Sequence, residues 1–142
     1  MNQSIMYSDT LDIPRDQILS VYEANKWSSA KRPDELCKGL ANSAALITAW
    51  DGDRLVGLGN AISDGHLVVY YPHLLVHPDY HRRGIGSEIL QRLRAKFQGF
   101  HQQILISEQH AFEFYKACGF TRAGKRIPMV VSSRETSLDA PI

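Results

Sequence analysis

Apolar residues at helical spacing near the start of the chain predict two helices behind a short first strand. The strand is expected over residues 4–8. The helices are expected over 14–25 and 33–40. Each would begin with a proline, and proline is well suited to the first position of a helix. Three residues of the first helix share one face: Ile18, Leu19 and Tyr22. Each helix should therefore turn an apolar side toward a core.

The middle of the chain predicts a meander of three strands, over residues 43–50, 54–63 and 66–77. Asp-Gly pairs separate the strands, and such pairs are a strong signal for tight hairpin turns. Strands joined in this way must be antiparallel neighbours. Pro72 lies inside the third strand. Because proline cannot donate a hydrogen bond to a strand ladder, a bulge or kink is expected near it.

The second half of the chain predicts a helix, a strand, a second helix and then one or two last strands. The clearest helix covers about residues 84–97 and has a continuous apolar stripe. A short apolar strand over 103–107 and a helix over 110–118 follow, and residues 120–131 are expected to form the last strands. Because a helix joins the long middle strand to 103–107, these two strands should be parallel.

This order of elements predicts an α/β fold, with a mixed sheet and helices on both of its faces. We expect a single domain over residues 1–142. Residues 132–142 have little to bury, so they are expected to form a mobile tail or an edge element.

Composition and charge narrow the class of protein. The chain has 142 residues, 44% of them hydrophobic, which is enough for one core and one cleft. A formal net charge of +1 argues against a nucleic-acid binder, and the sequence has neither a membrane-length apolar run nor a visible signal peptide. Cys37 and Cys118 have no metal-binding spacing and suggest reduced thiols. We therefore expect a cytoplasmic protein without a membrane partner.

The loop at residues 81–87, His-Arg-Arg-Gly-Ile-Gly-Ser, places two arginines and two glycines at the start of the clearest helix. The first N–H groups of a helix are unpaired and carry partial positive charge. Glycine lets the backbone approach a bulky anion closely. The loop therefore fits a cradle for a pyrophosphate. The alternative is a glycine pair that only makes a tight strand-to-helix turn. Two other nucleotide-binding motifs do not match, because the sequence has neither a P-loop nor a complete dinucleotide fingerprint.

Two segments around this loop match the signatures of a known family. LLVHPDYHRRGIGSEILQRL (74–93) resembles the acetyl-coenzyme A binding motif of the GNAT N-acetyltransferase superfamily, and AFEFYKACGF (111–120) resembles its second signature. The order of elements is also similar over most of residues 4–131. The resemblance implies a GNAT-like mixed, mostly antiparallel twisted sheet. It also implies an acetyl-CoA-dependent N-acetyltransferase that acts on a primary amine by direct transfer.

The resemblance further implies which residues hold acetyl-CoA. The pantetheine arm is expected along Leu74, Leu75 and Val76, where a bulge splays neighbouring strands. Ala111 and Phe114 of the second signature belong to the same site. The pyrophosphate is expected on the residues of one continuous loop: His81, Arg82, Arg83, Gly84, Ile85, Gly86 and Ser87.

The chain departs from the family pattern at two positions. His81 stands where relatives usually carry glutamine or arginine. Because most contacts at this loop come from backbone N–H groups, this change should weaken cofactor binding little. Glu108 stands where many relatives carry asparagine, which puts one hydrogen bond to cofactor or substrate in question.

Acetyl transfer to an amine needs a base for the amine and an acid for the departing thiolate. The resemblance makes Tyr115 the candidate acid, and a core tyrosine packed on the sheet is the alternative. His73, near the expected bulge, is the candidate base because imidazole titrates near neutral pH. A hydrogen-bonded strand histidine is the equal alternative. Asp64 suggests a turn residue and Glu108 a solvated carboxylate more than a base, and water alone could relay the proton.

The sequence leaves the acceptor and the assembly open. Specificity is expected from residues 24–36, which do not distinguish a small amine from a peptide N-terminus or a lysine side chain. No metal is expected, because the histidines lack ligand spacing. A homodimer is an open alternative. The competing hypothesis for function is a non-catalytic acyl-CoA-binding sensor or interaction module.

Overall fold

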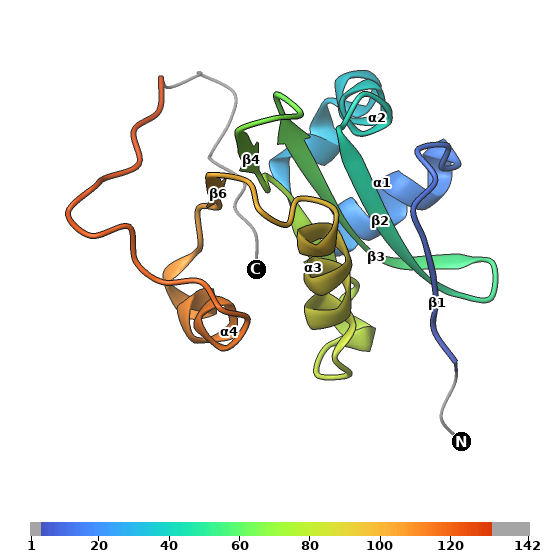
Figure 1. The fold of residues 1–142 in the computed structure, drawn as a ribbon. Coiled ribbons are helices and arrows are strands. Elements are labelled where there is room, and N and C mark those ends of the chain that lie inside the picture. The colour runs from blue at the N-terminus through green and yellow to red at the C-terminus, as the bar shows by residue number, and fades with distance from the viewer. Residues whose placement is uncertain (1–3, 132–142) are drawn as a thin grey trace.

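The fold is built around one six-stranded sheet (Figure 1). The structure is a computed structural model and describes residues 4–131. The strands are β1 (Met6–Ser8), β2 (Ala45–Asp51), β3 (Arg54–Ser63), β4 (Val68–Tyr70), β5 (Leu74–Val76) and β6 (Gln102–Ile104). The α-helices are α1 (Arg15–Ala24), α2 (Pro33–Ala41), α3 (Ile85–Ala95) and α4 (Phe112–Ala117). Short 3-10 helices are η1 (Ser28–Lys31), η2 (Pro78–Tyr80) and η3 (Gln109–Ala111).

The long strand β3 organises the sheet. Along one edge it pairs antiparallel with β2, which pairs in turn with β1. Along its other edge it pairs antiparallel with two successive short strands, β5 and β4. β4 also pairs with β6, and this pairing is parallel. The mixed and mostly antiparallel sheet is therefore confirmed, as is the parallel connection through α3.

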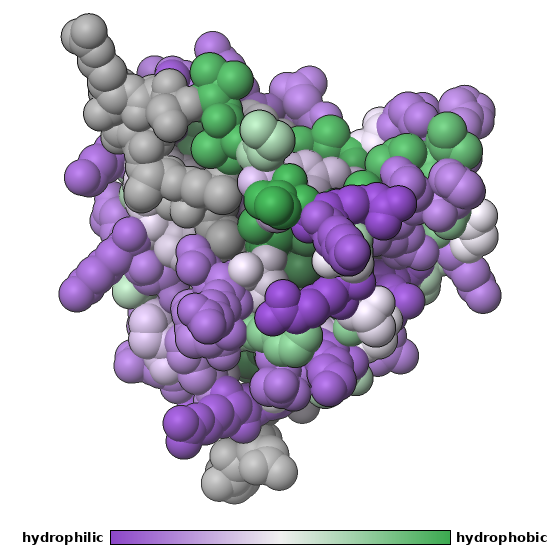
Figure 2. Space-filling view, turned by 90° about the vertical axis from the view of Figure 1, so that its left-hand side faces the viewer, coloured by the Kyte–Doolittle hydropathy of each residue, from purple (hydrophilic) through white to green (hydrophobic). Residues whose placement is uncertain are grey.

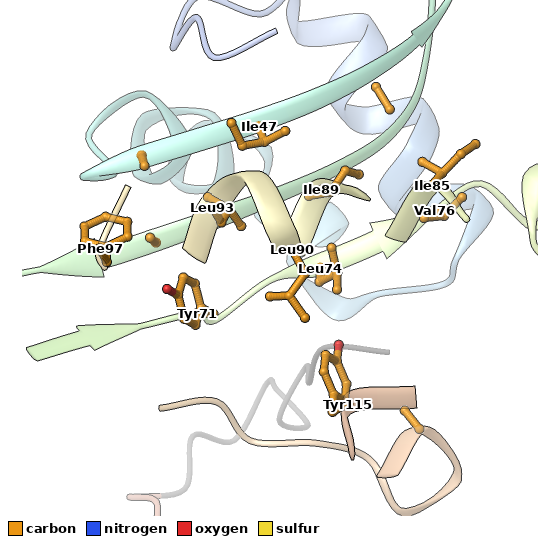
Figure 3. Packing of buried hydrophobic residues seen from close by; sticks show 14 of the residues in the cluster. Ile47, Tyr71, Leu74, Val76, Ile85, Ile89, Leu90, Leu93, Phe97 and Tyr115 are labelled. Atoms are coloured by element: carbon orange, nitrogen blue, oxygen red, sulfur yellow. The ribbon is translucent and has the colours of Figure 1, made fainter. Parts of the chain in front are cut away.

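Helices cover both faces of the sheet (Figure 1). α1 and α2 pack on one face, in a cluster that includes Tyr22, Trp27 and Leu75. α3 packs on the other face, and its apolar stripe lies against the sheet as predicted (Figure 3). The residues of the stripe, and Phe97 just beyond the end of the helix, are all buried: Ile85, Ile89, Leu90, Leu93 and Phe97.

Two glycines of β3 let α3 lie close to the sheet. A Cβ atom at Gly59 would lie 2.9 Å from Ile89 Cγ2 and 3.0 Å from Leu93 Cδ1. A Cβ atom at Gly57 would lie 3.2 Å from Ile89 Cδ1. The side chains of α3 therefore fill space that side chains of β3 would otherwise take. This close packing fixes the helix against the strand next to β5.

Most predicted elements are present, with small shifts at their ends. The helix predicted over 14–25 begins at Arg15, and Pro14 stands just before it. The long strand predicted over 66–77 is divided into β4 and β5, and the division contains Pro72 as expected.

The prediction of last strands over residues 120–131 is wrong. In the described part of the chain this segment forms no strand, and it extends outward beyond α4 (Figure 1). Four of its apolar side chains are exposed: Ile127, Met129, Val130 and Val131. An apolar run becomes a strand only where a neighbour offers backbone partners and a surface to cover, and no described strand pairs with this one. The face that carries it mixes apolar and charged side chains (Figure 2).

Other expectations concern the tail, the membrane and the cysteines. The tail prediction for residues 132–142 lies outside the described residues. Between residues 4 and 131, no helix is both long and apolar enough to cross a membrane. Cys37 and Cys118 are free thiols, each half-buried.

The contact between α3 and β3 predicts opposite effects for two glycine-to-alanine changes. Gly59→Ala should lower the free energy of unfolding by about 1–3 kcal/mol, because the new methyl group meets packed side chains. Gly39→Ala is the control, because Gly39 is exposed in α2 and has no heavy atom within 4 Å of an added Cβ. It should raise the free energy of unfolding by about 0.5–1 kcal/mol. Urea unfolding measures both, and an unchanged midpoint for Gly59→Ala would contradict the close packing.

Candidate active site

The sheet loses a pairing at the point where β4 ends. β4 pairs with β6 as far as Tyr70 and Ile104, and the N–H of Tyr71 adds a 3.0 Å hydrogen bond to the Ile104 carbonyl. Beyond this point β5 pairs with β3 alone among the described residues, and the chain after Ile104 continues to α4. One edge of β5 is therefore left without a backbone partner in the described structure. We call this edge, at residues 74–76, the open edge of β5.

A buried asparagine holds the chain where the strand divides. The N–H of Asn60 donates to the His73 carbonyl, and Asn60 Oδ1 accepts from the His73 N–H, both at 3.1 Å. Asn60 Nδ2 donates to Ser43 Oγ at 3.0 Å, and Ser43 Oγ donates to the Gly39 carbonyl at 3.1 Å. These bonds link the division to α2. The sequence analysis missed Asn60, although a single amide inside the apolar segment 54–63 was a usable signal.

His73 lies among aromatic side chains of the N-terminal segment. Its Nδ1 is 2.7 Å from the hydroxyl oxygen of Tyr22, which is fully buried. The Trp27 ring contacts the His73 ring edge-on, with 5.1 Å between centroids. His73 therefore lies on the face of the sheet that α1 and α2 cover. His73 is thus a hydrogen-bonded histidine, which was the alternative in the sequence analysis. Its role as a base stays a prediction.

The predicted anion loop follows β5 and η2. His81 points back to the strand, with Nε2 2.9 Å from the Val76 carbonyl oxygen. Arg82 (φ 64°) and Gly84 (φ 78°) have left-handed backbone conformations. α3 then begins at Ile85, and no side chain caps its N-terminus. Its first N–H groups therefore have no acceptor within the helix. No heavy atom lies within 4 Å of the place where a Cβ of Gly84 would be, which leaves room for a ligand.

The guanidinium of Arg83, in this loop, lies over an aromatic ring. Its guanidinium lies 4.9 Å from the centroid of Tyr80, and the guanidinium of Arg54 lies 5.5 Å from the same centroid. The Tyr80 hydroxyl donates to Asp51, and this hydrogen bond raises the pKa of Tyr80. The cluster joins the loop to the β2–β3 hairpin, and the sequence analysis did not find it. A phosphate contact from Arg83 stays a prediction.

α4 brings the second signature to the loop. A Cβ atom at Gly86 would lie 3.4 Å from Phe114 Cζ and 3.7 Å from Val76 Cγ2, so the strand, the loop and α4 meet at this glycine. Phe114 packs edge-on against Tyr115, with 4.9 Å between centroids. Tyr115 is buried, and burial raises the pKa of its hydroxyl. In Figure 3 its ring points from α4 toward Leu74 and Leu90.

The structure thus brings most of the predicted site residues together, on two faces of the sheet. Val76, Ile85, Ala111 and Tyr115 belong to the buried cluster on the α3 face. Leu75 belongs to the cluster on the opposite face, where His73 also lies. Ser87 is exposed in the first turn of α3. The candidate acid and the candidate base therefore approach the open edge of β5 from opposite faces.

Asp64 has a structural role. Its carboxylate accepts hydrogen bonds from three backbone N–H groups of the turn. These bonds, from Leu67, His66 and Val68, lower the pKa of that carboxyl. Asp64 therefore stabilises the turn, which is the role that the sequence analysis favoured. The expectation of no metal stays a prediction.

A separate cavity of about 710 Å³ lies beside β6. It is lined by β6 and the residues after it, by α4, and by part of the segment 120–128. Tyr115 borders it, whereas no residue of β5 or of the anion loop does. Glu108 also lines it and is exposed, as expected for a solvated carboxylate. This cavity is therefore distinct from the open edge of β5, and the two share Tyr115.

Known proteins resemble this chain in sequence and in fold. The chain is 26% identical over 139 residues to "GCN5-related N-acetyltransferase 3, chloroplastic" from Arabidopsis thaliana. The aligned region covers 95% of this chain but only 56% of that relative. A GNAT family acetyltransferase from Streptococcus pneumoniae has a similar structure, with a TM-score of 0.79 and 26% identity over 93% of this chain and 100% of that one.

A more distant structure shares the fold alone. It is an aminoglycoside N-acetyltransferase in complex with CoA, with a TM-score of 0.69 and 10% identity over 94% of this chain and 97% of that one. The model of the family described as "Acetyltransferase (GNAT) domain" matches residues 12–129. The match covers strands β2 to β6, the anion loop and both signatures, so this chain belongs to the GNAT acetyltransferase family.

Proposed function

We propose that this protein transfers the acetyl group of acetyl-CoA directly to a primary amine of a small molecule or peptide. The observation that carries the proposal is the meeting of three features at one strand. These are the open edge of β5, the uncapped start of α3 with Gly84 before it, and the buried Tyr115 of α4. The structural neighbour named as an aminoglycoside N-acetyltransferase supports an amine as acceptor.

The residues present fit acetyl-CoA. The N–H groups at the start of α3 would hold the pyrophosphate, and the open space at Gly84 admits phosphate oxygens close to the backbone. The open edge of β5, at Leu74, Leu75 and Val76, offers backbone groups to the amide-rich pantetheine arm. Phe114, which lies against Gly86, would form part of the wall of the same site.

Acetyl-CoA, when bound, supplies a thioester whose acyl carbon is open to attack by an amine. In direct transfer the C–N bond forms and the C–S bond breaks. Backbone N–H groups near Val76 would stabilise negative charge on the carbonyl oxygen. Tyr115 would give its hydroxyl proton to the departing sulfur. Burial raises the pKa of Tyr115, so the hydroxyl is protonated at neutral pH.

The proton of the amine requires an acceptor, and we assign this role to His73. Its position directly before β5 places the imidazole at the start of the open edge. The Asn60 hydrogen bonds fix its backbone on both sides. Water relay remains the competing route, and the His73 variant described below distinguishes the two.

The function is tested by a thiol-release assay across a library of amines. We expect acetyl-CoA-dependent thiol release with at least one amine and an acetylated product by mass spectrometry. The library should contain small amines, peptide N-termini and lysine side chains, because the segment 24–36 names none of them. Tight CoA binding without turnover on any amine would contradict the proposal and favour the acyl-CoA sensor.

The anion loop predicts that Gly84→Asp abolishes CoA binding, because it adds a carboxylate where phosphate should lie. Gly99→Asp is the matched control. Gly84 and Gly99 both have left-handed φ angles, 78° and 86°, and both have open space at the Cβ position. The backbone strain is therefore similar in the two variants, and only Gly84 lies on the loop. Calorimetry should show affinity lost for the first and kept for the second, and equal affinities would remove the loop from the site.

The assigned acid predicts that Tyr115→Phe lowers kcat by about a hundredfold while the Kd for CoA stays unchanged. Tyr70→Phe, on the half-buried Tyr70 of β4, is the control and should keep kcat. Because the pKa of Tyr115 is raised, wild-type kcat should show no fall from ionisation of this group at pH 9–10. Steady-state rates across pH check both points, and an active Tyr115→Phe enzyme would show that another group protonates the sulfur.

The assigned base predicts that His73→Gln lowers kcat by about a hundredfold and removes the fall of rate below neutral pH. His66→Gln is the control, because His66 is exposed in the turn before β4. Steady-state kinetics with the best amine from the library measure both. Wild-type kcat in His73→Gln would mean that water relays the proton.

A further inference from the structure

Arg94, on α3, makes two contacts with the turn that ends α4. Its Nη1 donates a 2.6 Å hydrogen bond to the carbonyl of Cys118, the residue that follows the helix. Its guanidinium lies over the ring of Phe120, 5.1 Å from the centroid. Cys118 and Phe120 belong to the second signature, whereas Arg94 lies just beyond the first. The arginine therefore joins the helix that carries the anion loop to the helix that carries Tyr115.

Gly119 lets the arginine approach this turn. It has a left-handed backbone conformation (φ 97°), and a Cβ atom at this position would lie 3.0 Å from Arg94 Nη1. Because the same nitrogen is bound to the Cys118 carbonyl, it could make room only by weakening that hydrogen bond. Both the backbone conformation and the position of the arginine thus favour glycine here.

The same turn is bound to Tyr115. The Tyr115 carbonyl accepts hydrogen bonds from the N–H groups of Cys118 and Phe120, both at 3.0 Å. The ring of Phe120 contacts the ring of Tyr115 edge-on, with 6.2 Å between centroids. The Tyr115 ring is buried and points toward Leu90, one turn before Arg94 on α3 (Figure 3). A displacement of the turn would therefore displace the phenol ring.

α4 depends on such contacts because it is short. It spans only six residues, Phe112–Ala117. A helix of this length is not stable by itself, so contacts with its neighbours hold it in place. On the α3 side, Phe114 contacts Gly86 at the start of α3, and Arg94 binds the turn after α4 near the end of α3. The arginine thus fixes the end of α4 that follows Tyr115.

We propose that Arg94 is a positioning residue, which holds the phenol of Tyr115 where it can give its proton to the departing sulfur. The inference rests on the proposed function, in which Tyr115 is the acid. Arg94 itself exchanges no proton, because a guanidinium stays charged over the pH range of the reaction. It acts through the turn at residues 118–120.

The order of the Tyr115 ring is measured by ¹³C NMR of protein labelled at its tyrosine rings. The Tyr115 signals are assigned by their loss in Tyr115→Phe. Arg94→Met should shift and broaden them, because the turn loses its contact with α3. We expect this variant to fold, because methionine keeps an apolar stem and the buried Nε that it removes has no hydrogen-bond partner in the described part of the chain. Unmoved Tyr115 signals in folded Arg94→Met would overturn the inference.

Arg92→Met is the matched control. Arg92 lies on the same helix, and its guanidinium also covers an aromatic ring, that of Tyr7, at 4.6 Å from the centroid. Its replacement should move the Tyr7 signals and leave those of Tyr115 in place. Equal shifts of the Tyr115 signals in Arg92→Met and Arg94→Met would show a general loosening of α3 and would overturn the inference.

Gly119→Ala tests the same contact from the side of the turn. The added methyl group should displace Arg94 Nη1 and shift the Tyr115 signals. Gly99→Ala controls for backbone strain, because Gly99 has a similar φ of 86° and open space at the Cβ position. It should leave the Tyr115 signals in place. Wild-type Tyr115 signals in Gly119→Ala would contradict the role of this contact.

Kinetics show whether the contact acts through Tyr115. Arg94→Met should lower kcat by about ten- to a hundredfold, as a small misplacement of a reacting group does, while the Kd for CoA stays unchanged. In the Tyr115→Phe background the same change should alter kcat by no more than about twofold, because the group that Arg94 positions is gone. A merely structural arginine would lower kcat by the same factor in both backgrounds or would weaken CoA binding, and either result would reject the proposal.

The proposed function fails separately. Wild-type kcat in Tyr115→Phe rejects the acid, and the positioning role of Arg94 in catalysis falls with it. Loss of kcat in Tyr115→Phe together with wild-type kcat and Tyr115 signals in Arg94→Met keeps the acid and rejects Arg94 alone.

Discussion

The division of one long strand after Tyr70 is the constraint on which the rest of the site depends. Pro72 prevents a continuous ladder, and Asn60 takes both backbone hydrogen-bonding groups of His73, so the chain re-enters the sheet as β5. Pairing with β6 ends at the same point. A single polar residue inside an apolar strand thus stabilises an irregular segment that would otherwise leave backbone groups buried and unpaired. The open edge of β5 is the result.

The helices packed on the two faces of the sheet place candidate catalytic side chains on opposite sides of this edge. On one face, Gly57 and Gly59 let α3 lie against β3, which places the start of the helix beside Val76 and lets Phe114 reach Gly86. On the other face, α1 carries Tyr22 to His73. The open edge is reached by a buried phenol on one side and an imidazole on the other. In the direct transfer proposed above, the phenol would protonate the sulfur and the imidazole would accept the proton of the amine.

Local signals explain how much of this could be predicted from the sequence. The apolar stripe of α3, the Asp-Gly hairpins, the break at Pro72 and the glycine loop each depend on residues close together in the chain. The prediction of last strands failed because strand formation depends on a neighbour that is distant in the sequence. Residues 120–131 have the apolar residues of a strand, yet no described strand pairs with them. Asn60, Tyr22 and the Tyr80–Asp51 contact were missed for the same reason. Their roles come from partners 13 to 51 residues away.

The central claim is that the start of α3 and the open edge of β5 form one binding site for CoA. It is tested most directly by following backbone amide signals of ¹⁵N-labelled protein during a CoA titration. The account predicts large shifts at residues 84–87, where N–H groups meet phosphate, and at residues 74–76, where they meet the pantetheine arm. The signal of Gly99, beyond the far end of α3, should stay in place. Saturable shifts confined to the cavity beside β6, with residues 74–76 and 84–87 unmoved, would contradict the account.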